Sequence, residues 1–139
     1  MSNRARFVEV VRGYVGTPYQ HLGRLPGVGL DCAGVPLCAM AEVGLEPPDA
    51  RYGLCPSVDE LEHWLAEVAH RKSIEDRAPG DLIAAEHGGG LGHVAVVVDA
   101  AHDLVVLARA RTAGGGRVSQ VRMSSALRPR SCWQLGGLA

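Results

Sequence analysis

Cys32 and His93 are the two residues of this sequence best suited to covalent chemistry. Cys32 follows a glycine-rich stretch and opens an apolar segment with helical character. Backbone dipoles at a helix N-terminus favour a thiolate, so we expect a lowered thiol pKa and a nucleophile at this position. His93 begins an apolar run after a cluster of glycines, where an imidazole can act as a general base.

Each of these residues also has a plainer structural interpretation. Most free cysteines are small buried apolar side chains, and Cys38 and Cys132 fit that description better than Cys32. Cys55 lies in a proline-rich stretch and fits either interpretation. A single histidine is most often a surface or capping residue. Cysteine and histidine in separate segments are nevertheless the usual sequence pattern of a thiol hydrolase, because the two meet only in the folded chain.

The composition narrows the classes of protein. A length of 139 residues predicts a single domain over 1–139. The 14 Lys and Arg residues nearly balance 15 Asp and Glu residues, which argues against a nucleic-acid partner and against a polybasic membrane anchor. A hydrophobic share of 47% argues against disorder, and six aromatics beside 18 glycines predict a core of Val, Leu and Ala.

Export and metal-binding signals are absent from the sequence. The N-terminal residues contain no apolar export segment, and no apolar run reaches the roughly 20 residues that span a bilayer. We therefore expect a protein that is cytoplasmic on synthesis, has free thiols and does not bind a membrane. The four cysteines form no CxxC pair, so no metal or cofactor is expected.

The first half of the chain has helical patterns. The spacing of Phe7, Val10, Val11 and Tyr14 predicts an amphipathic helix over 4–15. The following stretch to Asp31 is rich in glycine and proline and is predicted to be a loop.

Two more helices are expected before the pattern changes to strands. One runs from Cys32 to about Val43. The other begins with a capping box, Ser57 followed three residues later by Glu60, and ends near His70 to Lys72. Strands are then predicted over 81–85, 93–98, 104–110, 118–122 and 132–135. Helices followed by strands indicate an α+β domain with an antiparallel sheet.

Two sequence blocks resemble the NlpC-type cell-wall cysteine peptidases. The first is GTPYQHLGRLPGVGLDCAGV, with a Gly-x-Pro-Tyr turn that leads into Asp-Cys-x-Gly. The second is APGDLIAAEHGGGLGHVAVVVD, with Pro-Gly-Asp-Leu followed by Gly-His-Val. The resemblance extends from about residue 6 to the end and is closest to the single-domain branch encoded with phage and prophage tail genes. It implies a papain-like core in which N-terminal helices, including the nucleophile helix, pack on a C-terminal antiparallel sheet.

The resemblance also implies roles for individual residues. Cys32 would be the nucleophile and His93 its general base. Tyr19 would bind the oxyanion or the substrate, together with a backbone N–H at the helix start. Asp31 would shape the loop or a substrate subsite, and His21 would line the cleft or cap the loop. The plainer alternatives are a packed turn tyrosine at Tyr19 and a helix-capping aspartate at Asp31.

The sequence departs from the family at two places. Ala33 stands where many members have Ser, which bears on substrate recognition. The family also places a third polar residue, usually His, on the strand after the base, but the segment over 105–110 around Ala108 and Arg109 has no His. Arg109 cannot accept a hydrogen bond from an imidazole. The stand-ins are a backbone carbonyl, a water molecule, His102 or Thr112.

Three functions follow from these patterns. The resemblance implies a peptidase that cleaves the bond from γ-D-glutamate to a diamino acid in peptidoglycan stem peptides, in a protein associated with phage tails. The missing third polar residue favours a structural or assembly protein that binds other phage tail proteins and keeps the fold without robust catalysis. A thiol acyltransferase or amidase on the same core is the third hypothesis.

Overall fold

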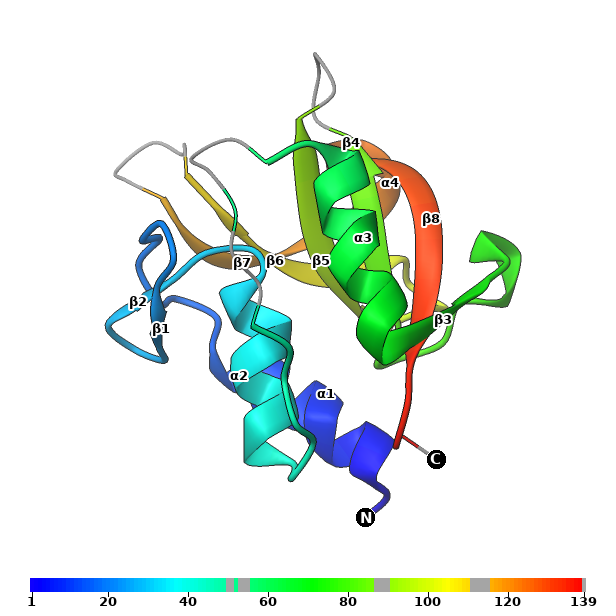
Figure 1. The fold of residues 1–139 in the computed structure, drawn as a ribbon, viewed down its shortest axis with the longest axis horizontal. Coiled ribbons are helices and arrows are strands. Elements are labelled where there is room, and N and C mark those ends of the chain that lie inside the picture. Colours follow the sequence, from blue (N-terminus) through cyan, green and yellow to red (C-terminus); the bar gives the residue numbers. More distant parts are fainter. Residues whose placement is uncertain (50–51, 53–55, 87–90, 111–115, 139) are drawn as a thin grey trace.

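The computed structural model describes residues 1–49, 52, 56–86, 91–110 and 116–138, and its centre is a six-stranded antiparallel sheet (Figure 1). The strands lie in the order β3-β8-β4-β5-β6-β7. Their bounds are β3 Ala69–Lys72, β4 Leu82–Glu86, β5 Gly92–Asp99, β6 Leu104–Arg109, β7 Arg117–Arg122 and β8 Arg128–Leu135. A small separate hairpin consists of β1 Arg24–Leu25 and β2 Gly29–Leu30.

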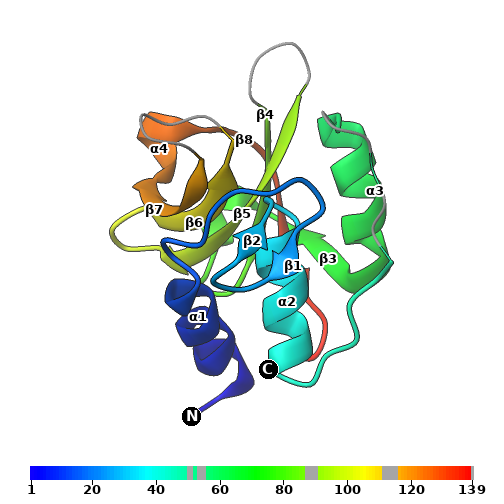
Figure 2. The same cartoon turned by 90° about the vertical axis from the view of Figure 1, so that its left-hand side faces the viewer.

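Helices cover both faces of this sheet. The helices are α1 Asn3–Gly13, α2 Gly34–Glu42, α3 Val58–Val68 and α4 Met123–Ala126, with a 3-10 turn η1 at Ile74–Asp76. The first three helices pack on one face, and α4 crosses the other between β7 and β8 (Figures 1 and 2). This arrangement confirms the predicted α+β fold with N-terminal helices packed on an antiparallel sheet. Within the described residues, none of the helices is both long enough and apolar enough to cross a membrane.

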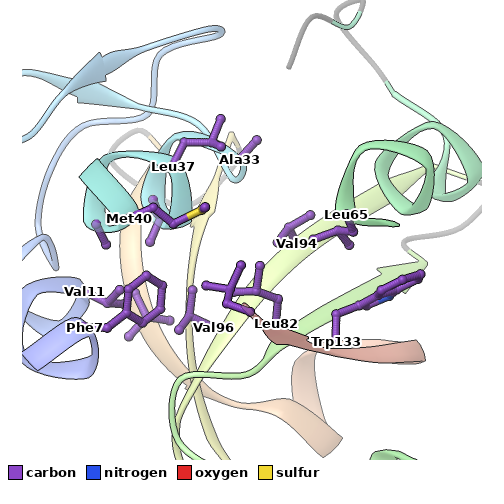
Figure 3. Close-up of a cluster of buried hydrophobic side chains, with 14 of the residues drawn as sticks. Phe7, Val11, Ala33, Leu37, Met40, Leu65, Leu82, Val94, Val96 and Trp133 are labelled. Carbon is purple, nitrogen blue, oxygen red and sulfur yellow. The ribbon is translucent and has the colours of Figure 1, made fainter. Parts of the chain in front are cut away.

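The main core lies between the sheet and helices α1, α2 and α3. Phe7 and Val11 of α1 meet the same region as Met40 of α2 and Val96 of β5, all of them buried (Figure 3). Leu65 of α3 adds to this layer from the other side. A second, smaller cluster on the opposite face is formed by Ile83, Ala85, Ala95, Val97, Val105, Leu107, Met123, Leu127 and Cys132. Aliphatic residues therefore dominate both layers, as the composition predicts.

The capping box predicted at the start of α3 is confirmed. The Ser57 hydroxyl accepts a hydrogen bond from the Glu60 N–H at 3.1 Å, which satisfies one of the free donors at the start of α3. Ser2 caps α1 in the same way through the Ala5 N–H at 3.1 Å. The apolar stripe of α3 is buried against the sheet, so the capping box places the first turn of this helix next to β5.

The end of α3 and the start of β8 differ from the prediction. The helix ends at Val68, and residues expected to complete it form the edge strand β3. β8 starts at Arg128, four residues earlier than expected, since the prediction began at Cys132. Long-range strand pairing outweighs the local pattern in both cases. β3 pairs with the end of β8, Ala69 opposite Leu135, and the start of β8 pairs with β4, Arg128 opposite Glu86.

A buried carboxylate joins α1 to the sheet. Asp81, just before β4, is fully buried and accepts the Ala78 N–H at 2.8 Å. It also forms ion pairs with Lys72 of β3 at 2.7 Å and with Arg4 of α1 at 3.2 Å. Such a carboxylate is tolerated in the interior because each oxygen has a cationic partner. The group therefore fixes the N-terminal helix against the strand that precedes β5.

Loss of the Ser57 cap tests how much α3 depends on it. We expect Ser57→Ala to lower the free energy of unfolding by about 1 kcal/mol, because the start of α3 loses its side-chain acceptor. Chemical denaturation followed by circular dichroism measures this change. Ser125→Ala, at an exposed serine of α4, is the control and should leave the free energy of unfolding nearly unchanged. Equal effects of the two substitutions would contradict the capping role.

Candidate active site

One cavity brings together all five residues that the sequence singled out. Its volume is about 820 Å³, and its lining includes Tyr19, His21, Asp31, Cys32 and His93. These residues come from the loop before α2 and from the start of β5. A cavity of this size matches the sites that bind small molecules and peptide segments. The fold therefore unites the two sequence blocks at one place.

Cys32 lies two residues before α2, since that helix begins at Gly34 and not at Cys32 as predicted. Its side chain is buried, with 8% of its surface exposed. Burial raises the pKa of the Cys32 thiol to about 11, and the negative charge of Asp31 acts in the same direction. The expectation of a lowered pKa is therefore wrong, because desolvation of the thiolate outweighs the favourable dipoles of the helix start.

Backbone groups around the Cys32 sulfur act in the opposite direction. Hydrogen bonding by the backbone at Val94, Ala33 and Cys32 itself lowers the thiol pKa, although by less than burial raises it. Val94 is the neighbour of His93, so the start of β5 lies against the sulfur. Backbone N–H groups that favour an anion at this point are also suited to a developing oxyanion.

The position of His93 depends on a close approach between α3 and β5. His93 is half-buried, pairs with Ala85 of β4 and follows Gly92, whose N–H donates to the Pro56 carbonyl at 2.9 Å. A Cβ atom on Gly92 would lie 2.8 Å from the Val58 backbone nitrogen and 2.6 Å from a Leu61 methyl group. Only glycine allows α3 to start so close to this strand.

That contact fixes where β5 begins, and with it the position of the His93 imidazole at the cavity. His93 is the second residue of the strand, so a shift of one residue in the register would turn its side chain to the other face of the sheet.

Tyr19 is held through its backbone from two sides. Its N–H donates to the Gly116 carbonyl at 2.8 Å, just before β7, and it forms a parallel bridge with Leu30 of β2. The side chain is half-buried and lines the cavity. His21, two residues on, also lines the cavity and places its ring edge against Tyr52, with ring centroids 5.9 Å apart. The Pro-Tyr turn therefore forms one wall of the site.

Asp31 is almost fully enclosed by hydrogen-bond donors. One carboxylate oxygen accepts the Gly34 N–H at 2.8 Å and the Arg24 Nη1 at 2.9 Å. The other accepts the Leu22 N–H at 2.8 Å and the hydroxyl of Tyr52. The bond to Gly34 satisfies a free donor at the start of α2, which is the capping geometry that the plainer interpretation predicts. Its side chain is only 3% exposed.

Sequence reasoning missed Tyr52 and Arg24. Tyr52 follows a proline-rich stretch with no helical or strand periodicity. Its partners lie 21 and 28 residues earlier in the chain, at Asp31 and Arg24. Contacts this distant leave no local spacing signal, and only the tertiary fold reveals them.

The place of the third polar residue is occupied by side chains that cannot orient His93. β5 pairs with β6 up to Val96 opposite Val106, and the family's residue is expected in the part of β6 beyond this pair, from Leu107 to Arg109. Leu107 is fully buried and has no polar atom, and a guanidinium cannot accept a hydrogen bond. An acceptor for the imidazole therefore has to come from elsewhere.

Of the two side chains expected as alternative acceptors for His93, His102 and Thr112, neither is found at the cavity among the described residues. His102 is exposed and pairs with Asp99 at 2.8 Å, beyond the end of β5 opposite to His93. Thr112 lies outside the described residues. A backbone carbonyl and a water molecule stay as predictions.

The other cysteines and histidines that the structure describes are not part of the cavity lining. Cys38 and Cys132 are free thiols, as is Cys32, whereas Cys55 falls outside the residues that the structure describes. His63 and His70 are exposed. Within the described parts of the chain, no group of three or more His, Cys, Asp or Glu side chains is arranged to hold a metal ion.

The fold and the cavity define a class of protein with a papain-like α+β core, in which a cysteine before a helix shares a cavity with a histidine at a strand start. The chain belongs to the NlpC/P60 family, whose pattern matches residues 16–125. No protein with a curated description has significant sequence similarity to it.

Solved structures share this fold at low sequence identity. The NlpC/p60 domain of the peptidoglycan hydrolase SagA superposes with a TM-score of 0.67 at 22% identity, over 95% of this chain and 98% of that domain. NlpC2 from Trichomonas vaginalis gives 0.68 at 18% identity, over 96% of this chain and 46% of its own. A protein similar to a lipoprotein of the NLP/P60 family from Staphylococcus aureus gives 0.65 at 16% identity, over 96% and 41%. The chain thus corresponds to less than half of the two longer proteins.

The raised pKa of Cys32 predicts a steep pH dependence of its alkylation. Because only the thiolate reacts, the rate should rise about tenfold per pH unit from pH 7 towards 10 without a plateau. Timed iodoacetamide labelling, with mass spectrometry of the Cys32 peptide, measures this rate. A plateau at pH 7 to 8 would show that the thiolate already forms at neutral pH and would contradict the prediction.

Proposed function

We propose that this protein is a cysteine hydrolase that cleaves peptidoglycan stem peptides at the bond from γ-D-glutamate to a diamino acid. The observation that carries the proposal is the cavity shared by Cys32 and His93 in a chain of the NlpC/P60 family. The similar domain of SagA, which belongs to a peptidoglycan hydrolase, supports the substrate class. The near-neutral net charge of −1 suits a peptide substrate better than a nucleic acid.

The first half of the reaction forms an acyl-enzyme. The Cys32 thiol is protonated at neutral pH, so His93 takes its proton as the sulfur attacks the peptide carbonyl carbon. The negative oxygen of the tetrahedral intermediate accepts hydrogen bonds from the Cys32 backbone N–H and the Tyr19 hydroxyl. The C–N bond then breaks, and the imidazolium of His93 gives its proton to the leaving amine of the diamino acid.

The second half of the reaction restores the enzyme. His93 takes a proton from a water molecule, whose oxygen attacks the thioester carbon. The C–S bond breaks, the thiolate of Cys32 recovers its proton from His93, and the γ-carboxyl group of the glutamate is released. One peptide bond and one water molecule are consumed, and the protein needs no other reactant.

Association with phage or prophage tails is a further part of the proposal that rests on the sequence resemblance. The match covers 98% of the SagA domain, so the hydrolase proposal concerns a unit of the same extent in this chain. We propose that the protein is cytoplasmic on synthesis and then joins the tail, where a hydrolase of this kind would reach the cell wall.

A second candidate function is favoured by the residues beside His93. Leu107 and Arg109 stand where an acceptor for the imidazole is expected, and neither can serve. The family's third polar residue is therefore absent from this part of β6. A structural or assembly protein of a phage tail that keeps the fold with impaired catalysis is therefore the alternative to the peptidase.

Substitution of the nucleophile separates the two functions. We expect wild type to hydrolyse purified stem peptide and Cys32→Ala to lose that activity, because no thioester can form. Product release followed by liquid chromatography and mass spectrometry measures it. Cys132→Ala removes a buried thiol of the opposite core face and should retain the activity. No hydrolysis by wild type, or equal rates for wild type and Cys32→Ala, would favour the structural function.

Substitution of the base tests the proton transfer. We expect His93→Ala to lower kcat by about a hundredfold to ten-thousandfold, the usual range for loss of a general base. Steady-state kinetics on the same peptide gives kcat and KM. The control is His63→Ala, an exposed histidine of α3, which should leave both constants unchanged. A His93→Ala variant with wild-type kcat would exclude this residue as the base.

A further inference from the structure

The buried carboxylate of Asp31 stands directly before the nucleophile in the chain. Its negative charge disfavours a thiolate at Cys32 and is one cause of the raised thiol pKa. A reaction that creates negative charge on the Cys32 sulfur is therefore opposed by repulsion from the Asp31 carboxylate. Some other group in the fold has to offset this charge.

Arg24 and Tyr52 surround the side of Asp31 that the backbone donors leave open. Arg24 of β1 donates to one carboxylate oxygen at 2.9 Å through Nη1, and its Nη2 donates to the Tyr52 hydroxyl at 3.1 Å. The Tyr52 hydroxyl in turn donates to the other oxygen of Asp31. The guanidinium also lies over the Tyr52 ring, 6.0 Å from its centroid. Three residues from three separate segments thus form one closed ring of contacts.

The same ring fixes the backbone on both sides of Cys32. Asp31 holds the Leu22 N–H and the Gly34 N–H, so its carboxylate ties the preceding loop to the start of α2. Leu22 adopts a φ of 58°, an unfavourable conformation for a branched side chain, which the bond to Asp31 helps to hold. A Cβ atom on Gly34 would lie 2.5 Å from the Gly23 carbonyl oxygen, so loop and helix are in direct contact here. Displacement of the carboxylate would move the nucleophile.

We propose that Arg24 and Tyr52 are positioning residues for Cys32, which act through Asp31 by neutralising its carboxylate and by holding the turn that carries the thiol. This inference deepens the proposed hydrolase function and rests on it for its catalytic meaning. Arg24 supplies the opposite charge. Tyr52 supplies a neutral donor that keeps the guanidinium and the carboxylate in one geometry.

Other charged and titratable groups also face the cavity around Cys32. Their effects on the thiol have to be distinguished from the effect of the Arg24–Asp31–Tyr52 ring. They are His93 of β5, Arg109 of β6, Arg122 at the end of β7, and Tyr19 and His21 of the preceding loop. Cys38 of α2 lies next to the ring, because its thiol donates to the Arg24 carbonyl at 3.4 Å. None of these is altered by a change at the Tyr52 hydroxyl.

Tyr52→Phe is the sharpest test because it removes one oxygen atom at the cavity wall. We expect the rate of Cys32 alkylation by iodoacetamide at pH 8.5 to fall roughly threefold to tenfold, as the less compensated carboxylate disfavours the thiolate. Arg24→Gln should lower the rate further, and Arg24→Lys should restore part of it by returning the charge. The matched control is Tyr14→Phe, a buried tyrosine that lies outside this cavity, and its rate should equal that of wild type.

A double variant distinguishes charge from a general loss of structure. In the Asp31→Asn background there is no carboxylate to neutralise, so adding Tyr52→Phe should no longer slow the alkylation. Thermal unfolding of each variant is recorded, and rates are compared only below its unfolding transition. An unchanged rate for folded Tyr52→Phe, or an equal slowing with and without Asp31→Asn, would overturn the inference.

The kinetics on stem peptide separate failure of this inference from failure of the hydrolase proposal. We expect Tyr52→Phe to lower kcat in the same proportion as the alkylation rate while KM changes little. If wild type cleaves no peptide but the alkylation rates follow the expected order, the positioning inference stands and the hydrolase proposal fails. If wild type cleaves the peptide and Tyr52→Phe matches it in kcat and in alkylation rate, only the positioning inference fails.

Discussion

A carboxylate can be buried in a protein only where donors surround it, and the turn that carries Cys32 is built around such a group. Asp31 has its two oxygens occupied by two backbone N–H groups, a guanidinium and a phenol. These donors come from the loop before it, the β1–β2 hairpin, the start of α2 and the segment that precedes α3. The hairpin lies beside the start of α2 in both views of the fold (Figures 1 and 2). Satisfying one charge therefore determines how four segments meet at the cavity.

Burial also sets the protonation state of the Cys32 thiol, the proposed nucleophile. A thiol at a helix start in water would have a lowered pKa, but Cys32 is enclosed by the loop and by β5, so desolvation raises its pKa to about 11. The backbone N–H groups at Val94 and Ala33 offset only part of that cost. In the proposed reaction, a thiol that is neutral at rest needs a base during the attack, so the position of His93 is decisive. Gly92 controls that position, because its missing side chain lets α3 pack against the strand start.

The neighbourhood of His93 leaves two functions in competition. The cavity that Cys32 and His93 share and the NlpC/P60 family both favour a hydrolase. Leu107 and Arg109 do not provide the orienting acceptor that an imidazole base uses. Both observations concern the imidazole of His93, so catalysis depends on what holds that imidazole in place. The Arg24–Asp31–Tyr52 ring, by contrast, is complete and would serve the nucleophile in either case.

The sequence by itself determined the class of fold and the five residues that meet in the cavity. Apolar periodicity located α1 and α3, the Ser57 capping box located the start of α3, and the two family blocks located Cys32 and His93 on either side of the site. These signals are local, because capping, periodicity and short motifs depend on residues a few positions apart. Only the tertiary structure decided the rest. β3 exists because it pairs with β8, the Cys32 pKa is raised because distant segments exclude water from it, and Tyr52 joins the site through partners 21 and 28 residues away. Each of these outcomes depends on which distant segments come together, and that information is absent from local spacing.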